Sequence, residues 1–120
     1  RTSRRGRCRK AGAVKFPAPI RAHFDADQDR CGAALVGAFA PDEVVKDEGK
    51  THVGRDAIEA WWRAAKAKYE HTAEPCEIRD EGGLCIVLAR VTGRFPGSPA
   101  LLRFAFQLEN GRIAALEIGA

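Results

Sequence analysis

The chain has 120 residues, 45% of them hydrophobic and 30% charged, so it is long enough for one hydrophobic core and too short for two. No apolar run reaches the roughly 18 to 20 residues of a membrane span, and the first residues lack the apolar segment of a secretory signal. We therefore expect a cytoplasmic protein with no membrane partner.

The net charge of +4 is distributed unevenly. Residues 1–15 hold seven basic residues and no acidic one, which leaves 13 basic against 16 acidic residues in the rest of the chain. Such a block is typical of a disordered, solvated tail or a remnant of expression, and residues 16–120 would form the folded domain. Binding to phosphates would need basic residues on the folded surface as well, so we expect no specific nucleic-acid partner.

The first helical pattern follows two prolines. Ile20, His23, Phe24 and Asp27 recur at the spacing of one face of an amphipathic helix. His23 therefore lies in an apolar stripe. An imidazole there is either a core residue with one bonded nitrogen or a group that contacts a ligand.

Two more helices are predicted before the main sheet. The pattern over Cys31–Ala40 indicates a short helix that Pro41 would end. The pattern over Asp56–Tyr69 indicates a longer one with an unbroken apolar stripe that includes both tryptophans. Because Trp61 and Trp62 are about 100° apart on a helix, we expect one to close an internal cavity and the other to pack against the sheet.

A short strand over Val44–Asp47 and a four-stranded meander complete the predicted elements. The meander strands are predicted over Ala73–Asp80, Leu84–Thr92, Leu101–Leu108 and Arg112–Ile118. Asn110-Gly111 between the last two is a strong hairpin signal. Helices followed by a meander indicate an α+β fold, in which three helices pack on a curved, mainly antiparallel sheet and enclose a cavity.

Asp47 ends the predicted short strand. Alternation places it on the same face as Val45, so its carboxylate points into the cavity if Val45 faces the core. Burial there would raise its pKa toward the working range of a general base or acid. The alternative is a strand-end aspartate that caps the turn at Glu48-Gly49.

Four segments resemble the SnoaL-like branch of the nuclear transport factor 2-like superfamily. They are Leu35–Gly49, Gly54–Trp61, Phe95–Pro99 and Leu108–Ile113, within a match over about residues 17–119. The resemblance implies a cone-shaped, cystatin-like roll, which also occurs in ketosteroid isomerases, polyketide cyclases, limonene-epoxide hydrolases and scytalone dehydratase. It does not fix the reaction, because this fold supports unrelated chemistries.

The resemblance to the ketosteroid-isomerase branch implies roles for single residues. The general base falls on Asp47, the oxyanion-hole donor on His23, and an aromatic residue that supports this donor on Trp62. The second oxyanion donor, a protonated aspartate, has no counterpart, because its position holds Arg103 or Phe104. This departure argues against steroid isomerisation itself.

We therefore predict an enzyme in which Asp47 and His23 form an acid–base pair that acts on a small, mostly apolar molecule. Isomerase, cyclase, dehydratase and hydrolase activities remain open. Residues expected to line the cavity are Trp62, Trp61, Phe39 and Phe104. No cofactor fingerprint or metal-ligand spacing is present, so we expect neither cofactor nor metal. The alternative is a non-catalytic member that binds a small ligand or a protein, and the resemblance also implies a homodimer paired through the outer face of the sheet.

Overall fold

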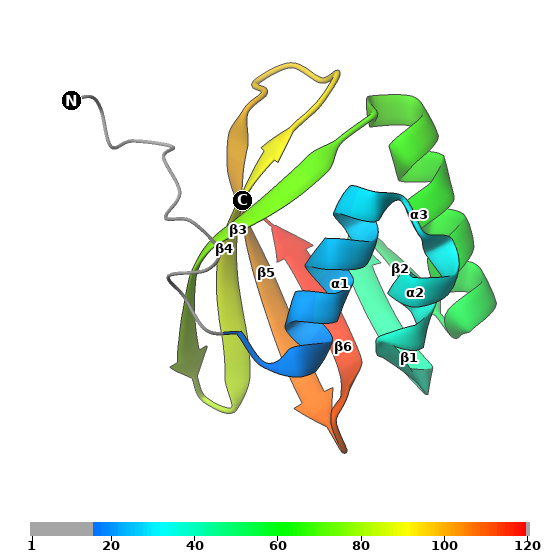
Figure 1. Cartoon of the computed structure of the whole chain (residues 1–120), viewed down its shortest axis with the longest axis vertical. Helices are drawn as coiled ribbons and strands as arrows, with labels where there is room; N and C mark the ends of the chain where they lie inside the picture. Colours follow the sequence, from blue (N-terminus) through cyan, green and yellow to red (C-terminus); the bar gives the residue numbers. More distant parts are fainter. Residues whose placement is uncertain (1–15, 120) are drawn as a thin grey trace.

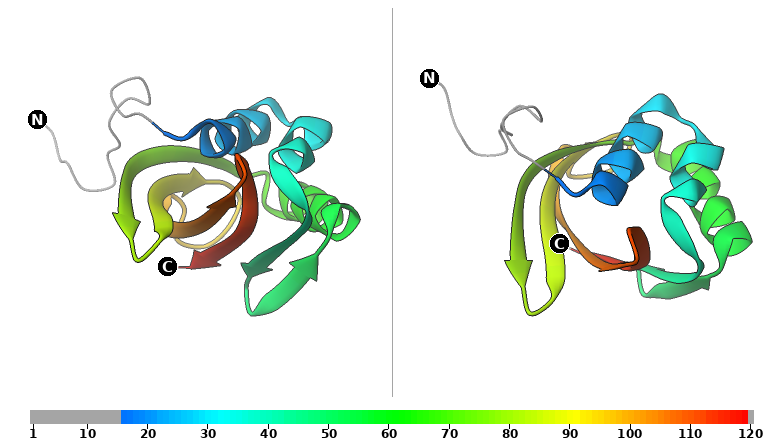
Figure 2. Two further views of the ribbon diagram at one scale, coloured as in Figure 1. Left: turned by 90° about the horizontal axis from the view of Figure 1, so that it is seen from below. Right: turned by 60° about the horizontal axis from the view of Figure 1, so that its bottom comes forward.

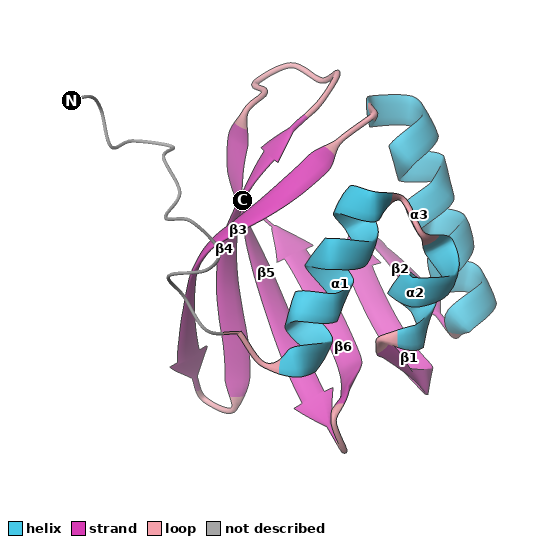
Figure 3. Ribbon diagram, in the orientation of Figure 1, coloured by secondary structure: helices cyan, strands magenta, loops and turns pink. Residues whose placement is uncertain are grey.

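The computed structural model describes residues 16–119, so the predicted basic tail over residues 1–15 lies outside the described residues. Within them, three helices pack on one six-stranded sheet (Figures 1 and 3). The helices are α1 (Ala18–Asp29), α2 (Gly32–Gly37) and α3 (Arg55–Tyr69). The strands are β1 (Phe39–Asp47), β2 (Lys50–Val53), β3 (Thr72–Glu81), β4 (Leu84–Thr92), β5 (Ala100–Glu109) and β6 (Arg112–Gly119).

The strand order is β2-β1-β6-β5-β4-β3, and every neighbouring pair is antiparallel except β1 with β6. The sheet curves strongly without closing, and the helices lie on its concave side (Figure 2). Asn110 and Gly111 both take positive φ values between β5 and β6, as the predicted hairpin turn requires. The predicted α+β fold, with helices on a curved and mainly antiparallel sheet, is confirmed.

The core lies between the concave face and the helices. The helices contribute the apolar stripes predicted from periodicity, and the strands contribute alternate residues. Its largest fully buried apolar side chains are Phe24, Phe39, Phe106, Ile20, Leu35, Ile58, Ile113 and Leu116. Burial of this apolar surface is the main force that holds the helices on the sheet.

The prediction for the second helix is wrong at its C-terminal end. The helix stops at Gly37, and Phe39 already begins β1, where it pairs with Ile113 of β6. The register of β1 against β6 then shifts before Val44. Pro41 therefore lies in an irregular stretch, where a strand tolerates a residue without a backbone N–H.

The chain turns sharply after α3. Glu70 ends the helix in the left-handed conformation, and β3 begins two residues later. The bend at Gly93–Arg94, directly after β4, passes so close to this corner that a Cβ on Gly93 would lie 2.7 Å from the Tyr69 carbonyl oxygen. The corner thus brings His71 close to Asp27 of α1 and Lys66 of α3.

Candidate functional site

A pocket of about 280 Å³ lies between the concave face of the sheet and helices α1 and α3. Its walls are mostly apolar, with Trp62, Ala65, Val91, Leu102, Phe104 and Ile118 among them. Its polar lining consists of His23, Asp27, Asp47, Glu48, Tyr69 and His71. A mostly apolar pocket with a few convergent polar groups is the usual form of a small-molecule site.

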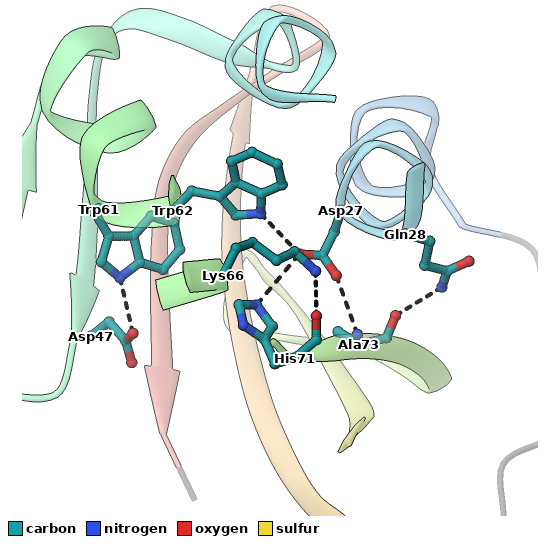
Figure 4. Close-up of polar contacts among 8 residues, drawn as sticks. All are labelled: Asp27, Gln28, Asp47, Trp61, Trp62, Lys66, His71 and Ala73. Carbon is teal, nitrogen blue, oxygen red and sulfur yellow. Dashed lines mark hydrogen bonds and ion pairs between the residues drawn. The ribbon is translucent and has the colours of Figure 1, made fainter. Parts of the chain in front are cut away.

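Asp27 of α1 lies at the centre of a buried polar cluster, which Figure 4 shows. Its Oδ1 accepts a hydrogen bond from Trp62 Nε1 at 2.9 Å and lies 3.1 Å from Lys66 Nζ. Its Oδ2 accepts a hydrogen bond from the backbone N–H of Ala73 at 3.2 Å. Nε2 of His71 lies 3.5 Å from Oδ1. Groups of α3 and of the start of β3 therefore converge on one carboxylate.

These partners keep Asp27 ionised although only 3% of the residue is exposed. Burial by itself would raise the pKa of this carboxyl, but the hydrogen bonds from His71 and Trp62 and the charge of Lys66 outweigh it and hold the pKa well below its usual range. Lys66 also donates to the carbonyl oxygen of His71. The Asp27–Lys66 ion pair thus fixes both α1 and the corner after α3.

Asp47 is in the opposite electrostatic situation. It is half-buried at the end of β1, and its Oδ2 accepts a hydrogen bond from Trp61 Nε1 at 3.0 Å. Burial raises the pKa of Asp47; the Trp61 hydrogen bond opposes this rise, and the neighbouring charge of Glu48 adds to it. The Asp47 carboxylate therefore bonds to α3, and none of its hydrogen bonds in the described residues goes to the turn that follows it.

His23 lies deep in the core and also lines the pocket. It is 4% exposed, and its ring makes edge contacts with Phe24 at 5.0 Å and Phe106 at 5.6 Å between centroids. Burial lowers its pKa to about 4, because desolvation outweighs the attraction of Asp27. Its Nδ1 is buried with no hydrogen-bond partner among the described residues. At neutral pH the side chain is therefore a neutral imidazole with spare hydrogen-bonding capacity.

The structure brings most of the predicted site residues to this pocket. His23, Asp47, Trp61, Trp62 and Phe104 are all among the residues that line it. Phe39 is not among them: as the first residue of β1 it is fully buried in the core, where its ring packs 5.8 Å from that of His23.

Sequence reasoning missed Asp27, Lys66 and His71 as site residues. One signal existed, because Asp27 is a charged residue on the apolar stripe of its helix, one turn from His23, and charged residues are rarely buried without a partner. Lys66 lies in the last turn of α3, where a lysine is usually explained by the helix dipole. His71 follows a helix end, where no periodic pattern marks it.

The described residues offer no obvious metal centre. Between residues 16 and 119 there is no group of three or more histidine, cysteine, aspartate or glutamate residues that could hold a metal ion. None of the helices described is both long and apolar enough to cross a membrane.

Comparison with known proteins gives consistent matches. The sequence profile of the SnoaL-like domain matches residues 20–116. A solved structure from Sinorhizobium meliloti, described as a candidate polyketide cyclase, is 48% identical with a TM-score of 0.83, and the match covers 86% of this chain and 94% of that one. None of the curated proteins matches the chain.

More distant solved structures share the fold alone. A hypothetical protein of Catenulispora acidiphila with a ketosteroid isomerase-like fold, solved in complex with trimethylamine, is 19% identical with a TM-score of 0.76, covering 88% of this chain and 87% of that one. A cystatin-fold protein of Novosphingobium aromaticivorans is 18% identical with a TM-score of 0.70, covering 86% and 96%.

Proposed function

The chain belongs to the SnoaL-like domain family, and we propose that it is a small enzyme that moves protons on a mostly apolar organic molecule. In this proposal Asp47 accepts a proton from the substrate, and His71, oriented by Asp27, returns one. Both groups are side chains of this chain, so the reaction requires no cofactor.

The observation that supports this proposal most strongly is the contrast between two aspartates of one pocket. Asp27 is surrounded by hydrogen-bond donors and an ammonium group, which hold its pKa low. Asp47 has one neutral donor, Trp61, and its pKa is raised by burial. Environments that push two carboxyl groups apart assign one as a permanent anion and the other as a group that exchanges protons.

Asp47 has the features of a general base. Trp61 occupies its Oδ2, and its Oδ1 has no hydrogen bond to any described residue, so this oxygen is available to a substrate or a water molecule. A partly desolvated carboxylate with a raised pKa abstracts protons more effectively than one in water. It would take the proton of a carbon next to a carbonyl group, or that of water. The neutral His23 would then donate a hydrogen bond to the developing oxyanion.

His71 has the features of the group that returns the proton. Its side chain is 17% exposed, and Nε2 faces the Asp27 carboxylate at 3.5 Å. The buried anion therefore orients the ring. The other ring nitrogen makes no hydrogen bond within the described residues, so it is available to the ligand. Asp27 thus orients His71, whereas Asp47 accepts the proton.

The S. meliloti relative suggests one substrate class. That protein is described as a candidate polyketide cyclase. Ring closure in a poly-carbonyl chain begins when a base removes a proton from a carbon next to a carbonyl group. The same step is assigned here to Asp47, so poly-carbonyl substrates are compatible with the proposal.

The base role can be tested without a native substrate. Nitrobenzisoxazole opens to a coloured phenolate when one carbon-bound proton is removed, so its rate reports a desolvated carboxylate directly. We expect the protein to accelerate this opening well beyond acetate at the same concentration. Asp47→Asn keeps the shape of the side chain and should lower the rate by about 10²–10⁴-fold.

Asp42→Asn is the matched control, because Asp42 lies on the same strand and is exposed. Its rate should equal that of the wild type. Equal rates for Asp47→Asn and the wild type would reject Asp47 as the base. A wild-type protein no faster than acetate would reject the enzyme and favour a ligand-binding member of the family.

A further inference from the structure

We propose that the ligand of this pocket is an amphipathic amine, with its apolar body inside the pocket and its ammonium group at the carboxylate of Glu48, beside Asp47 and the rings of Trp61 and Tyr69. The inference uses the same pocket as the proposed function and names the chemical class that the pocket selects.

The charges of the lining favour a cation. Three carboxylates line the pocket, and no lysine or arginine of the described chain does. The charge of Asp27 is balanced by Lys66 at 3.1 Å, whereas Asp47 and Glu48 each accept a hydrogen bond from a neutral aromatic donor only. A carboxylate or phosphate ligand would be repelled there, and an ammonium group would be attracted.

The aromatic residues beside these carboxylates fit the same ligand. Trp61 Nε1 donates to Asp47 at 3.0 Å, and the Tyr69 hydroxyl donates to Glu48 at 3.1 Å, so each ring is held next to a negative charge. Lys68 already places its ammonium nitrogen 5.0 Å from the centre of the Tyr69 ring. Aromatic rings combined with carboxylates are the usual recognition chemistry for ammonium ligands.

His23 supplies an independent sign of a ligand. The residue is 4% exposed and lines the pocket, and its ring Nδ1 is buried without a hydrogen bond to any described residue. Leaving such a group unsatisfied is costly, so its presence points to a polar atom of a ligand. A neutral imidazole pairs well with a hydroxyl or carbonyl group. The amine would therefore carry an oxygen function at the end of its apolar body that reaches His23.

Three probes with one ring and different head groups test the charge preference: phenethylamine, phenethyl alcohol and hydrocinnamate. Affinities are measured by calorimetry, and quenching of Trp61 and Trp62, the chain's two tryptophans, reports binding in the pocket. We expect the amine to bind at least about tenfold more tightly than the alcohol, and the carboxylate to bind most weakly. Equal or tighter binding of the alcohol would overturn the proposal.

Variants of Glu48 and His23 test where the two polar ends of the ligand bind. Glu48→Gln should weaken binding of the amine but not of the alcohol, whereas Glu77→Gln, which removes an exposed carboxylate of β3 outside the pocket, should change neither. Tyramine, which adds a hydroxyl to the far end of phenethylamine, should bind more tightly than phenethylamine, and His23→Phe should remove this gain. An unchanged preference for the amine in Glu48→Gln, or a tyramine gain that survives His23→Phe, would contradict the assignment.

The experiments distinguish the proposed base role of Asp47 from the proposed ligand class. A wild-type protein that opens nitrobenzisoxazole but does not prefer the amine would overturn the ligand class and leave the base role intact. A protein that prefers the amine but does not accelerate the opening would overturn the proposed enzyme and support the ligand class.

Discussion

Replacing Asp27 with asparagine should strongly destabilise the protein. The change keeps the size of the side chain but removes the charge and replaces one acceptor oxygen with an NH₂ donor. That donor would face either Trp62 Nε1 and the ammonium group of Lys66, at the position of Oδ1, or the backbone N–H of Ala73, at the position of Oδ2. In either orientation Lys66 would lose its counterion and keep only uncharged acceptors such as the carbonyl oxygen of His71.

The expected cost is about 3–5 kcal/mol, because removal of one member of a buried ion pair leaves the other charge buried without a counterion. Solvent cannot screen the remaining charge, since the side chains of Asp27 and Lys66 are 4% and 8% exposed. In a domain of this size such a loss lowers the melting temperature by on the order of 10 °C or more.

Urea unfolding at neutral pH measures this cost. Asp25→Asn is the matched control, because Asp25 is exposed on the same helix and its replacement should change the free energy of unfolding by less than about 0.5 kcal/mol. Adding Lys66→Met to Asp27→Asn should restore part of the stability, because it removes the stranded charge. If Asp27→Asn costs no more than Asp25→Asn, the buried cluster does not hold the helices as argued.

Three further predictions concern the surroundings of the pocket. Because folding lowers the pKa of His23 from 6.5 to about 4, the unfolded chain binds this proton at a higher pH than the folded protein does. Acidification from pH 6.5 to pH 4 should therefore lower the free energy of unfolding of the wild type by about 3 kcal/mol, a loss that His23→Phe should not show. Urea unfolding at both pH values measures this difference. Trp62→Phe removes the buried N–H that bonds to Asp27 and should cost about 1.5–3 kcal/mol in the same assay. Gly93→Ala should lower the free energy of unfolding by about 1–3 kcal/mol, because its Cβ would lie 2.7 Å from the Tyr69 carbonyl oxygen and 2.9 Å from His71 Cα. Gly119→Ala is the control, because its Cβ would meet nothing within 4 Å, and it should hardly change the melting temperature.

The parts of the fold that depend on local sequence could be predicted. The apolar stripe over Asp56–Tyr69 corresponds to α3, and the hairpin at Asn110–Gly111 joins β5 to β6 as expected. Both follow from the preferences of neighbouring residues. The resemblance to the SnoaL-like branch is confirmed by the profile match over residues 20–116.

The start of β1 could not be predicted, because a distant strand determines it. Phe39 continues a helical pattern in the sequence, yet its pairing with Ile113 draws it into the sheet. The shift of register that accommodates Pro41 is likewise a property of the β1–β6 pair and leaves no local pattern.

The site could be predicted only in part, again because some of its residues meet through distant contacts. Asp47 and His23 could be placed near a cavity from strand alternation and a helical stripe. In the cluster around Asp27, the partners Lys66 and His71 lie 39 and 44 positions further along the chain. The cluster therefore forms only when α1 packs against the corner after α3. A charge on an apolar stripe signals a buried partner without identifying it.

The two aspartates of the pocket should differ in pKa, because one is surrounded by donors and an ammonium group and the other is partly desolvated. Carbon-detected NMR titration of the side-chain carboxyl groups measures both pKa values in the wild-type protein. Asp47 should titrate above the ordinary aspartate value of 3.8, and Asp27 should remain ionised well below it. Titration of both groups together near 3.8, or in the reverse order, would show that the two carboxyl groups do not have these opposite environments.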